Sequence, residues 1–379
     1  MTDEIAPTPT GAPASTPTGK QPDRHWASRR AHHPVIAAGS ALFTLLLVAM
    51  VLGGGALWIG DARYRAPGPL AADKAVVVPN EYGVMDIADL LVKQGVIADK
   101  WVFVGAAVGT RASGKLKAGE YAFPQGASIA QVLDTIVSGK VLEYTVTIPE
   151  GLTSDQIVQR LMDVPELSGS IRQVPREGSL MPDTYKITRG TSREDVLRRM
   201  ARTQDAELKE IWEKRDPSVP LKSPEELVIL ASIVEKETGV AEERPLVAAV
   251  FVNRLNKKMK LQSDPTIIYG LVRGKGRLDR PITRTDITSP TPFNTYAIVG
   301  LPPGPIGNPG RASLEATANP AKTKHLYFVA DGTGGHVFAE TLDQHNKNVT
   351  RWRQIERDQN AAGTPAGTSG NTGVPHEID

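Results

Sequence analysis

The sequence predicts an α+β protein with a single N-terminal transmembrane helix, a small module and then a larger mixed α+β domain. One observation is a long apolar run without charged residues near the N-terminus. A second is a mixture of short alternating and helical patterns over residues 74–140, and a third is the same mixture over residues 141–357. At 379 residues the chain has room for about two to three folded units.

The transmembrane prediction rests on residues 35–59, a 25-residue run from Val35 to Ile59 that carries no charge. At about 1.5 Å per residue, this helix would exceed the roughly 30 Å thickness of the hydrocarbon core. A cleaved signal peptide is the alternative, but its apolar region usually has only about 7–15 residues and ends at a small-residue site. The exit at Trp58–Asp61 does not fit such a site. The sequence therefore predicts an uncleaved anchor.

The flanking charges predict the orientation of this anchor. The residues before it are basic, whereas those after it are mixed: Lys20, Arg24, Arg29 and Arg30 precede it, and Asp61, Arg63 and Arg65 follow. The positive-inside rule keeps the N-terminus in the cytoplasm. We therefore expect a single-pass protein of the cytoplasmic (inner) membrane whose remaining chain lies in the periplasm. Residues 1–34, rich in Pro and Thr, are predicted to form a disordered cytoplasmic tail.

The small module at residues 74–140 follows a predicted linker at residues 60–73. Its patterns predict a strand, two helices, a second strand and a third helix, at Val76–Val78, Gly83–Gln94, Asp99–Val108, Leu116–Phe123 and Ser128–Ser138. Ser128 suits the N-cap of the last helix.

The larger domain, residues 141–357, opens with an alternating strand at Tyr144–Ile148 and a helix start at Thr153–Gln156. A long helical stretch follows, then a Gly/Pro-rich loop region at 285–310 and a strand–turn–strand over Leu326–Ala339. Residues 358–379 are of low complexity and are predicted to form a disordered tail.

Composition and motifs exclude several function classes. The 44 Lys and Arg nearly balance the 42 Asp and Glu, whereas nucleic-acid-binding proteins usually have a clear basic excess or patch. The absence of cysteine removes thiol nucleophiles, iron–sulfur clusters and cysteine-ligated zinc. HExxH, GxSxG and Walker A motifs are missing, and Arg273–Arg277 has the pattern of a surface turn.

The histidines do not predict a metal site. The spacing of His325, His336 and His345 matches no common zinc pattern, so we expect structural or cleft roles for them. No metal and no cofactor are predicted.

The segment 223–238 predicts a helix that carries a candidate catalytic carboxyl group. Ser223 and Glu226 have capping-box spacing, with Pro224 at the first helical position. At about 100° per residue, Glu237 falls about 20° from Leu230, within the apolar stripe, whereas Glu235 and Lys236 point away from it.

A carboxyl group in an apolar stripe has two interpretations. Burial raises its pKa, which suits a general acid. Alternatively, it is a helix-end glutamate paired with Arg244 or Arg254. The helix geometry alone leaves both open.

Nearby polar and aromatic segments favour the catalytic interpretation. The segments 262–269, 291–296 and 300–306 are non-periodic and offer amides, hydroxyls and aromatic faces, the groups from which sugar sites are commonly built. The candidate substrate-binding residues are Gln262, Asp264, Tyr269, Asn294 and Tyr296.

Several long segments resemble the YceG-like, or MltG, family of endolytic murein transglycosylases. They are KAGEYAF (117–123), PDTY (182–185), LASIVEKET (230–238), VFVNRL (250–255), KLQSDPTIIYG (260–270), PTPFNTYAIVGLPPGPIGNPG (290–310) and NPAKTKHLYFVADGTGGHVFAETLDQHN (319–346).

The resemblance implies a LysM-like module at 74–140 and a catalytic domain that cuts nascent glycan strands. The family's catalytic glutamate corresponds to Glu237. The implied partners are peptidoglycan glycan strands and cell-wall synthases of the same membrane.

The expected reaction uses Glu237 as single acid and base. It cleaves the MurNAc–GlcNAc bond and leaves 1,6-anhydroMurNAc ends. Two alternatives remain open: a membrane-tethered, wall-binding scaffold without catalysis, and a muramidase-type hydrolase that uses Asp264 as a second carboxylate.

Overall fold

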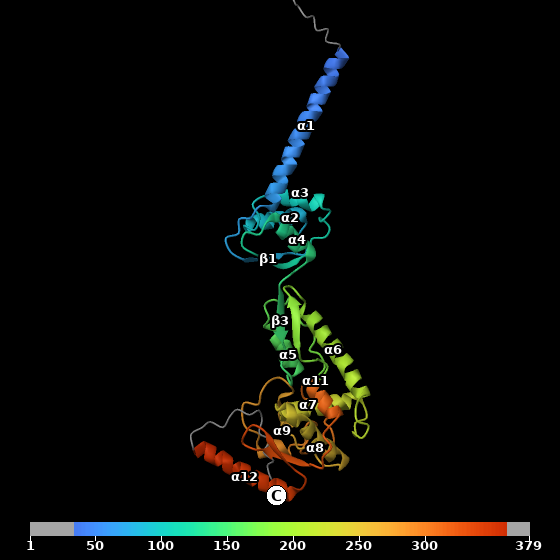
Figure 1. Ribbon diagram of the computed structural model, residues 1–379. Helices are drawn as coiled ribbons and strands as arrows, with labels where there is room; N and C mark the ends of the chain where they lie inside the picture. The colour runs from blue at the N-terminus through green and yellow to red at the C-terminus, as the bar shows by residue number, and fades with distance from the viewer. Residues whose placement is uncertain (1–33, 362–379) are drawn as a thin grey trace, which may run out of the picture. The chain divides into compact units, whose positions relative to one another are not determined.

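The computed structural model describes residues 34–361 (Figure 1). The chain divides into two compact units, with the boundary along the sequence between Arg63 and Tyr64. Helix α1, Pro34–Arg65, is the one helix in the described range that is long and apolar enough to cross a membrane, and none of its apolar window is buried. The helix therefore contains the predicted segment 35–59 but continues six residues into the predicted linker. The helix ends just before Ala66, which is followed by Pro67. The proline ring clashes sterically with the residue before it and disfavours helical backbone angles there. The predicted tail at 1–34 lies outside the described residues, except for Pro34.

The first part of the second unit contains all the elements that the patterns predict for residues 74–140. They are β1 (Lys74–Val78), α2 (Val84–Lys93), α3 (Lys100–Gly109), β2 (Gly119–Phe123) and α4 (Ile129–Ser138). β1 and β2 pair antiparallel, with Lys74 opposite Phe123. Ser128 caps α4 as predicted, and Gly139 ends it in the left-handed region at φ 71°. One hydrophobic cluster joins the three helices to the two strands.

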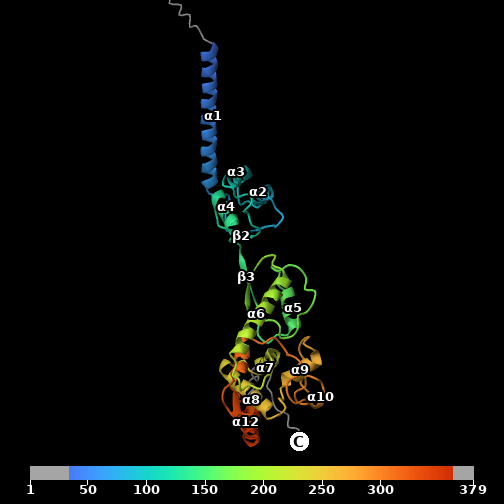
Figure 2. The same ribbon diagram turned by 90° about the vertical axis from the view of Figure 1, so that its right-hand side faces the viewer.

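The next part packs two helices on one face of a small sheet. It consists of β3 (Glu143–Thr147), α5 (Ser154–Met162), β4 (Thr184–Thr188) and α6 (Arg193–Glu213). β3 pairs antiparallel with β4, and the start of α6 packs beside this sheet (Figure 2). Thr153 caps α5, and the capping box is completed by Gln156.

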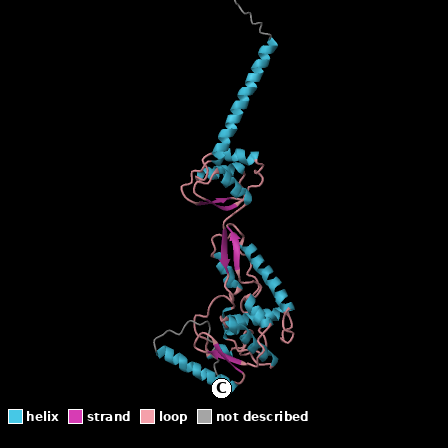
Figure 3. Cartoon of the chain, in the orientation of Figure 1, coloured by secondary structure: helices cyan, strands magenta, loops and turns pink. Residues whose placement is uncertain are grey.

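In the remaining part, α7 (Pro224–Glu237) packs against α8 (Arg244–Asn256) and α11 (Arg311–Ala318). Short helices η1 (Ala241–Glu243), α9 (Asp264–Val272) and α10 (Arg284–Thr288) lie between them in the sequence. Strands β5 (Tyr327–Ala330) and β6 (His336–Ala339) form the predicted strand–turn–strand, and α12 (Leu342–Ala361) packs on both. The strands of the described residues form three separate antiparallel pairs; they are drawn in magenta in Figure 3. The predicted mixed α+β class with one long apolar N-terminal helix is confirmed.

Four local predictions differ from the structure. The segment 262–269 is not irregular: it forms most of α9, with Pro265 in the first turn, where a missing N–H breaks no helical bond. The predicted loop 285–310 includes most of α10. Helix α12 continues to Ala361, past the predicted start of the tail at 358, and residues 362–379 are not described. The capping box of α7 is half-formed, because Ser223 accepts from the Glu226 N–H while Glu226 accepts from Lys222 instead.

Candidate active site

Glu237 is the last residue of α7, and its side chain is buried. Only 5% of the residue is exposed. The helix places it there because its apolar stripe packs on α8 and α11, and Glu237 continues that stripe. Ser263 donates a hydrogen bond from its Oγ to Glu237 Oε1 at 2.5 Å.

Burial raises the pKa of Glu237 from its ordinary value of 4.5 to about 7. The negative charge of Asp264 raises the pKa further, whereas the Ser263 hydrogen bond and the positive charge of Arg254 lower it. Such a carboxyl group holds a proton near neutral pH and can also give it up, which is the property required of a general acid and base.

The start of α9 positions Ser263 for this contact. The preceding residue, Gln262, has φ 55°, so the chain turns sharply there. Thr295 fixes the turn: its carbonyl accepts from the Gln262 N–H at 3.2 Å, and its Oγ1 accepts from the Ser263 N–H at 2.9 Å. Thr266 Oγ1 donates to the Ser263 carbonyl at 2.6 Å. The Ser263 hydroxyl is therefore held by a rigid local network.

Asp264 and Tyr296 form a second buried pair beside Glu237. The Tyr296 hydroxyl donates to Asp264 Oδ1 at 2.7 Å. Burial raises the pKa of Tyr296, and the neighbouring carboxylates of Asp264 and Glu237 raise it further. The phenol therefore keeps its proton and can serve as a fixed donor to Asp264.

The other three predicted substrate-binding residues have different surroundings. Gln262 is exposed, and its Oε1 accepts from Arg254 at 3.2 Å. Asn294 is completely buried and donates to the carbonyls of Asp286, Ile287 and Ser289, which favours a role in holding the loop over direct contact with sugar. Tyr269 lies further along α9 and donates to Glu177 Oε2 at 3.1 Å.

Tyr269 also lines a pocket of about 580 Å³ next to this site. Lys236, which precedes Glu237, and Pro265, which follows Asp264, are in its wall. The segment Arg273–Arg277 does form a turn as predicted, but Gly274, Gly276 and Arg277 are also part of this wall.

Glu235 and Lys236 point away from the apolar stripe, but they do not face open solvent. The Glu235 side chain is 6% exposed; it accepts from the Gly310 N–H at 2.9 Å and lies 3.9 Å from Arg244. Arg244 also pairs with Glu150 at 3.4 Å. Arg254 donates to the carbonyls of Leu261 and Leu326. Within residues 34–361, neither arginine forms an ion pair with Glu237.

The three histidines lie in separate surroundings. His336 Nδ1 is 2.7 Å from Glu243 Oε2, which also accepts from Thr238 Oγ1. His345 stacks on Tyr327, and burial lowers its pKa to about 4. His325 stacks on Phe338. Across the described residues, no group of three or more His, Asp or Glu side chains is arranged to hold a metal ion.

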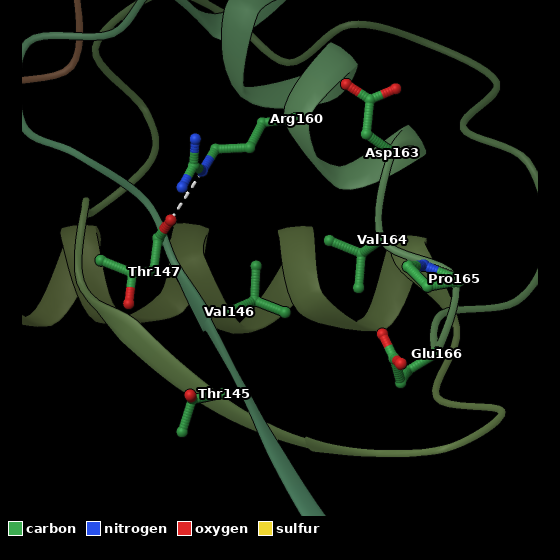
Figure 4. Close-up of a pocket in the computed structure, with 8 residues that line it drawn as sticks. All are labelled: Thr145, Val146, Thr147, Arg160, Asp163, Val164, Pro165 and Glu166. Carbon is green, nitrogen blue, oxygen red and sulfur yellow. Dashed lines mark hydrogen bonds between the residues drawn. The ribbon is translucent and has the colours of Figure 1, made fainter.

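A second pocket, of about 350 Å³, lies beside β3 and the end of α5 (Figure 4). None of the predicted site residues lines it. Arg160 donates there to the Thr147 carbonyl at 2.7 Å, as the dashed line in the figure shows, so its charge already has a backbone partner. The buried carboxyl group and its hydrogen-bonding network therefore favour the region around Glu237 as the functional site.

Comparison with known proteins assigns the family. The model of the YceG-like family matches residues 76–351. The chain belongs to the YceG-like family. An endolytic murein transglycosylase from Bacillus subtilis (strain 168) is 31% identical over 332 residues, which cover 78% of this chain and 89% of the relative. The protein of the same name from Streptococcus pneumoniae (strain ATCC BAA-255 / R6) is 31% identical over 322 residues, which cover 72% of this chain and 57% of that longer protein.

Among solved structures of the YceG-like group, one from Listeria monocytogenes is 31% identical to this chain. The match covers 73% of this chain and 98% of the solved chain, with a TM-score of 0.46.

The patterns in the sequence did not indicate several residues of this candidate site. Ser263 lies in a segment whose sequence pattern does not indicate a helix. Only its hydrogen bond to Glu237, 26 positions away, shows that it belongs to this candidate site. Lys236 and Arg277 line the pocket from two distant segments, and Glu177 accepts a hydrogen bond from Tyr269 in its wall. In the sequence, Lys236 and Ser263 are marked only by lying inside segments that resemble the YceG-like family, LASIVEKET (230–238) and KLQSDPTIIYG (260–270).

Proposed function

We propose that this chain is a membrane-anchored endolytic lytic transglycosylase that acts on peptidoglycan. The observation that carries the proposal is the buried Glu237, hydrogen-bonded to Ser263, with its pKa raised to about 7. The names of the Bacillus and Streptococcus relatives support the same activity.

The proposed reaction needs only one group that exchanges a proton. Protonated Glu237 donates to the glycosidic oxygen between MurNAc and GlcNAc, and the bond from that oxygen to MurNAc C1 breaks. The C6 hydroxyl of the same MurNAc attacks C1 and loses its proton to the Glu237 carboxylate. The products are a 1,6-anhydroMurNAc end and a free GlcNAc 4-hydroxyl, with no water consumed and Glu237 protonated again. Because the nucleophile is tethered to the reacting carbon, the ring closure has the advantage of an intramolecular reaction.

The other parts of the chain have proposed roles in this activity. Helix α1 anchors the enzyme in the cytoplasmic membrane with the N-terminus in the cytoplasm, which its length and apolar composition support. Residues 74–140 form a LysM-like module, supported by the strand–helix–helix–strand order of β1, α2, α3 and β2. Asp264 and Tyr296 orient the sugars beside the scissile bond, and Asn294 holds the loop that carries Tyr296. Cell-wall synthases of the same membrane are the proposed partners.

The reaction is tested by cleaving uncrosslinked glycan strands with the full chain in detergent micelles, in water enriched in oxygen-18. We expect internal fragments with 1,6-anhydroMurNAc ends that contain no oxygen-18, because the nucleophile is the substrate's own hydroxyl. Mass spectrometry separates them from hydrolysis products, which are heavier by one labelled water. Labelled reducing ends would contradict the proposal and favour a hydrolase that uses Asp264. Binding to glycan without cleavage would favour a scaffold.

The hydrogen bond from Ser263 leads to a prediction about pH. Ser263→Ala removes a donor that favours the ionised form of Glu237, so the pKa of Glu237 should rise. We expect the alkaline limb of the pH–rate profile to move upward by roughly 0.5–1 pH unit, as the loss of about 1 kcal/mol predicts. Ser168→Ala is the control, because its exposed hydroxyl donates only to the Gly190 carbonyl. An unchanged limb in Ser263→Ala would show that this hydroxyl does not tune the acid.

A further inference from the structure

The pocket beside the site contains two positive charges without a carboxylate partner. Lys236 and Arg277 both line it, and within the described part of the chain neither side chain forms a hydrogen bond or an ion pair. Lys236 is half-buried, whereas Arg277 is exposed. Burial lowers the pKa of Lys236, and the charge of Arg277 lowers it further. A partly buried, unpaired ammonium group beside a second positive charge is unfavourable, so the pocket is suited to an anionic ligand.

The nearby carboxylates are held by other partners. Glu177 accepts from the Ser154 N–H at 2.8 Å, from Asn308 Nδ2 at 3.1 Å and from the Tyr269 hydroxyl at 3.1 Å. Glu235 is held by the Gly310 N–H and lies beside Arg244. Both carboxylates act on Lys236 only beyond ion-pair distance. The positive charge of the pocket therefore remains available to a ligand.

The wall that carries Arg277 is fixed in place. Thr153 Oγ1 donates to the Gly274 carbonyl at 2.6 Å, which ties the turn after α9 to the start of α5. Gly274 has φ 74°, and a Cβ atom there would lie 3.2 Å from the Tyr269 ring, so a larger residue would not fit without movement. The backbone of the turn is therefore fixed three residues before Arg277.

Much of the remaining wall is apolar, with Thr153 and Gln156 as polar exceptions. The apolar side chains come from the segment before α5, from α9, from the turn and from the loop before α11: Leu152, Ile268, Val272, Leu278 and Ile306. A suitable ligand thus combines a carboxylate with small apolar groups. On a murein strand the sugar rings are neutral. Where a peptide is attached to MurNAc, the lactyl carboxyl is part of the amide bond and the carboxylates lie on the peptide; where the peptide has been removed, the lactyl group itself carries a carboxylate.

We propose that this pocket binds a carboxylate on the lactyl–peptide arm of the MurNAc whose glycosidic bond is cleaved. Lys236 and Arg277 pair with the carboxylate, and methyl groups of the lactyl or alanyl units pack on the apolar wall. This proposal rests on the proposed function. Lys236 and Glu237 are adjacent in sequence on one helix, so recognition of the arm would help to position the scissile bond at the acid.

The test compares Arg277→Gln with Lys275→Gln in the full chain. Lys275 is an exposed residue of the same turn that does not line the pocket, so it controls for loss of surface charge. On uncrosslinked glycan with peptides, we expect Arg277→Gln to raise KM about 10-fold, as removal of a charge-assisted hydrogen bond predicts, while Lys275→Gln does not. Arg277→Lys should recover most of the loss, since it restores the positive charge.

Chemically altered substrates identify the group that is bound. On glycan whose carboxylates have been converted to amides, wild type and Arg277→Gln should have the same raised KM. On glycan stripped of peptide, a remaining difference would assign the contact to the free lactyl carboxylate, and its disappearance would assign it to the peptide. Equal KM values for Arg277→Gln and Lys275→Gln on the natural glycan would overturn the pocket proposal. If wild type produces no anhydro ends, the proposed function itself fails, which is a separate result.

Discussion

Replacing Glu237 with glutamine is expected to lower the rate of glycan cleavage by about 10²–10⁴-fold, the usual contribution of a general acid or base. Glutamine keeps the shape of the side chain but neither gives nor accepts the proton in the way the reaction needs. Binding of uncrosslinked glycan should be retained, because the surrounding network loses only one acceptor oxygen. The rate is measured as the appearance of 1,6-anhydroMurNAc ends, with binding measured in the same preparation.

The matched control is Glu225→Gln. Glu225 lies in the first turn of the same helix and is exposed, so its replacement changes the charge of α7 without touching the site. Glu235→Gln is a less suitable control, because Glu235 is held by Gly310 and lies beside Arg244. Equal cleavage rates for Glu225→Gln and Glu237→Gln would show that Glu237 is not the acid.

The second large effect concerns stability. The pKa of Glu237 is about 7 in the folded protein and close to 4.5 in the unfolded chain. Because the folded value is the higher one, the protonated group favours folding. Its contribution is complete below about pH 4.5 and is lost as the pH rises through 7. The loss amounts to about 3 kcal/mol of the free energy of unfolding, since one pKa unit corresponds to about 1.4 kcal/mol.

Glu237→Gln should remove this dependence, because glutamine does not ionise. We therefore expect the variant to gain stability relative to wild type between pH 5 and 8, measured by urea unfolding of both proteins across that range. The comparison of the two proteins is essential, since other groups titrate as well. Burial also raises the pKa of Glu177, whereas hydrogen bonds from Arg280 and Thr283 lower the pKa of Asp286. Parallel stability curves for wild type and variant would contradict the raised pKa.

Glu237 is therefore expected to increase activity and to decrease stability at neutral and alkaline pH. The same burial that makes the folded protein less stable at alkaline pH keeps the carboxyl group protonated near neutral pH. A variant that is more stable and inactive is the expected result of removing the acid.

The sequence allowed prediction of those parts of the site that depend on local periodicity. Helical spacing from Leu230 placed Glu237 in the apolar stripe, and the structure buries it there. It also predicted correctly that Glu235 points away from that stripe. It could not show that the segment around Gly310 covers Glu235, because that contact joins positions 75 residues apart.

Other features depend on contacts that no local pattern encodes. The segment from Gln262 lacks a visible helical period, yet tertiary packing and the proline in the first turn permit α9. The side-chain amide of Asn294 could bind a ligand, but in the folded chain it donates hydrogen bonds to backbone carbonyls instead. The pocket combines α5, α9 and the end of α7, and only the folded chain brings Lys236 and Arg277 to one wall.

The last turn of α7 also constrains how the sequence can change in length. Three consecutive side chains there have three different surroundings: Glu235 lies beside Arg244, Lys236 lines the pocket and Glu237 is bonded to Ser263. Each residue inserted or deleted between the cap at Ser223 and this turn would rotate all three by about 100°. The acid would then point toward the pocket or toward Arg244. Substitutions along α7 can be accommodated one at a time, whereas a single insertion or deletion would misplace the whole set, so the spacing between Ser223 and Glu237 is expected to be fixed among functional variants.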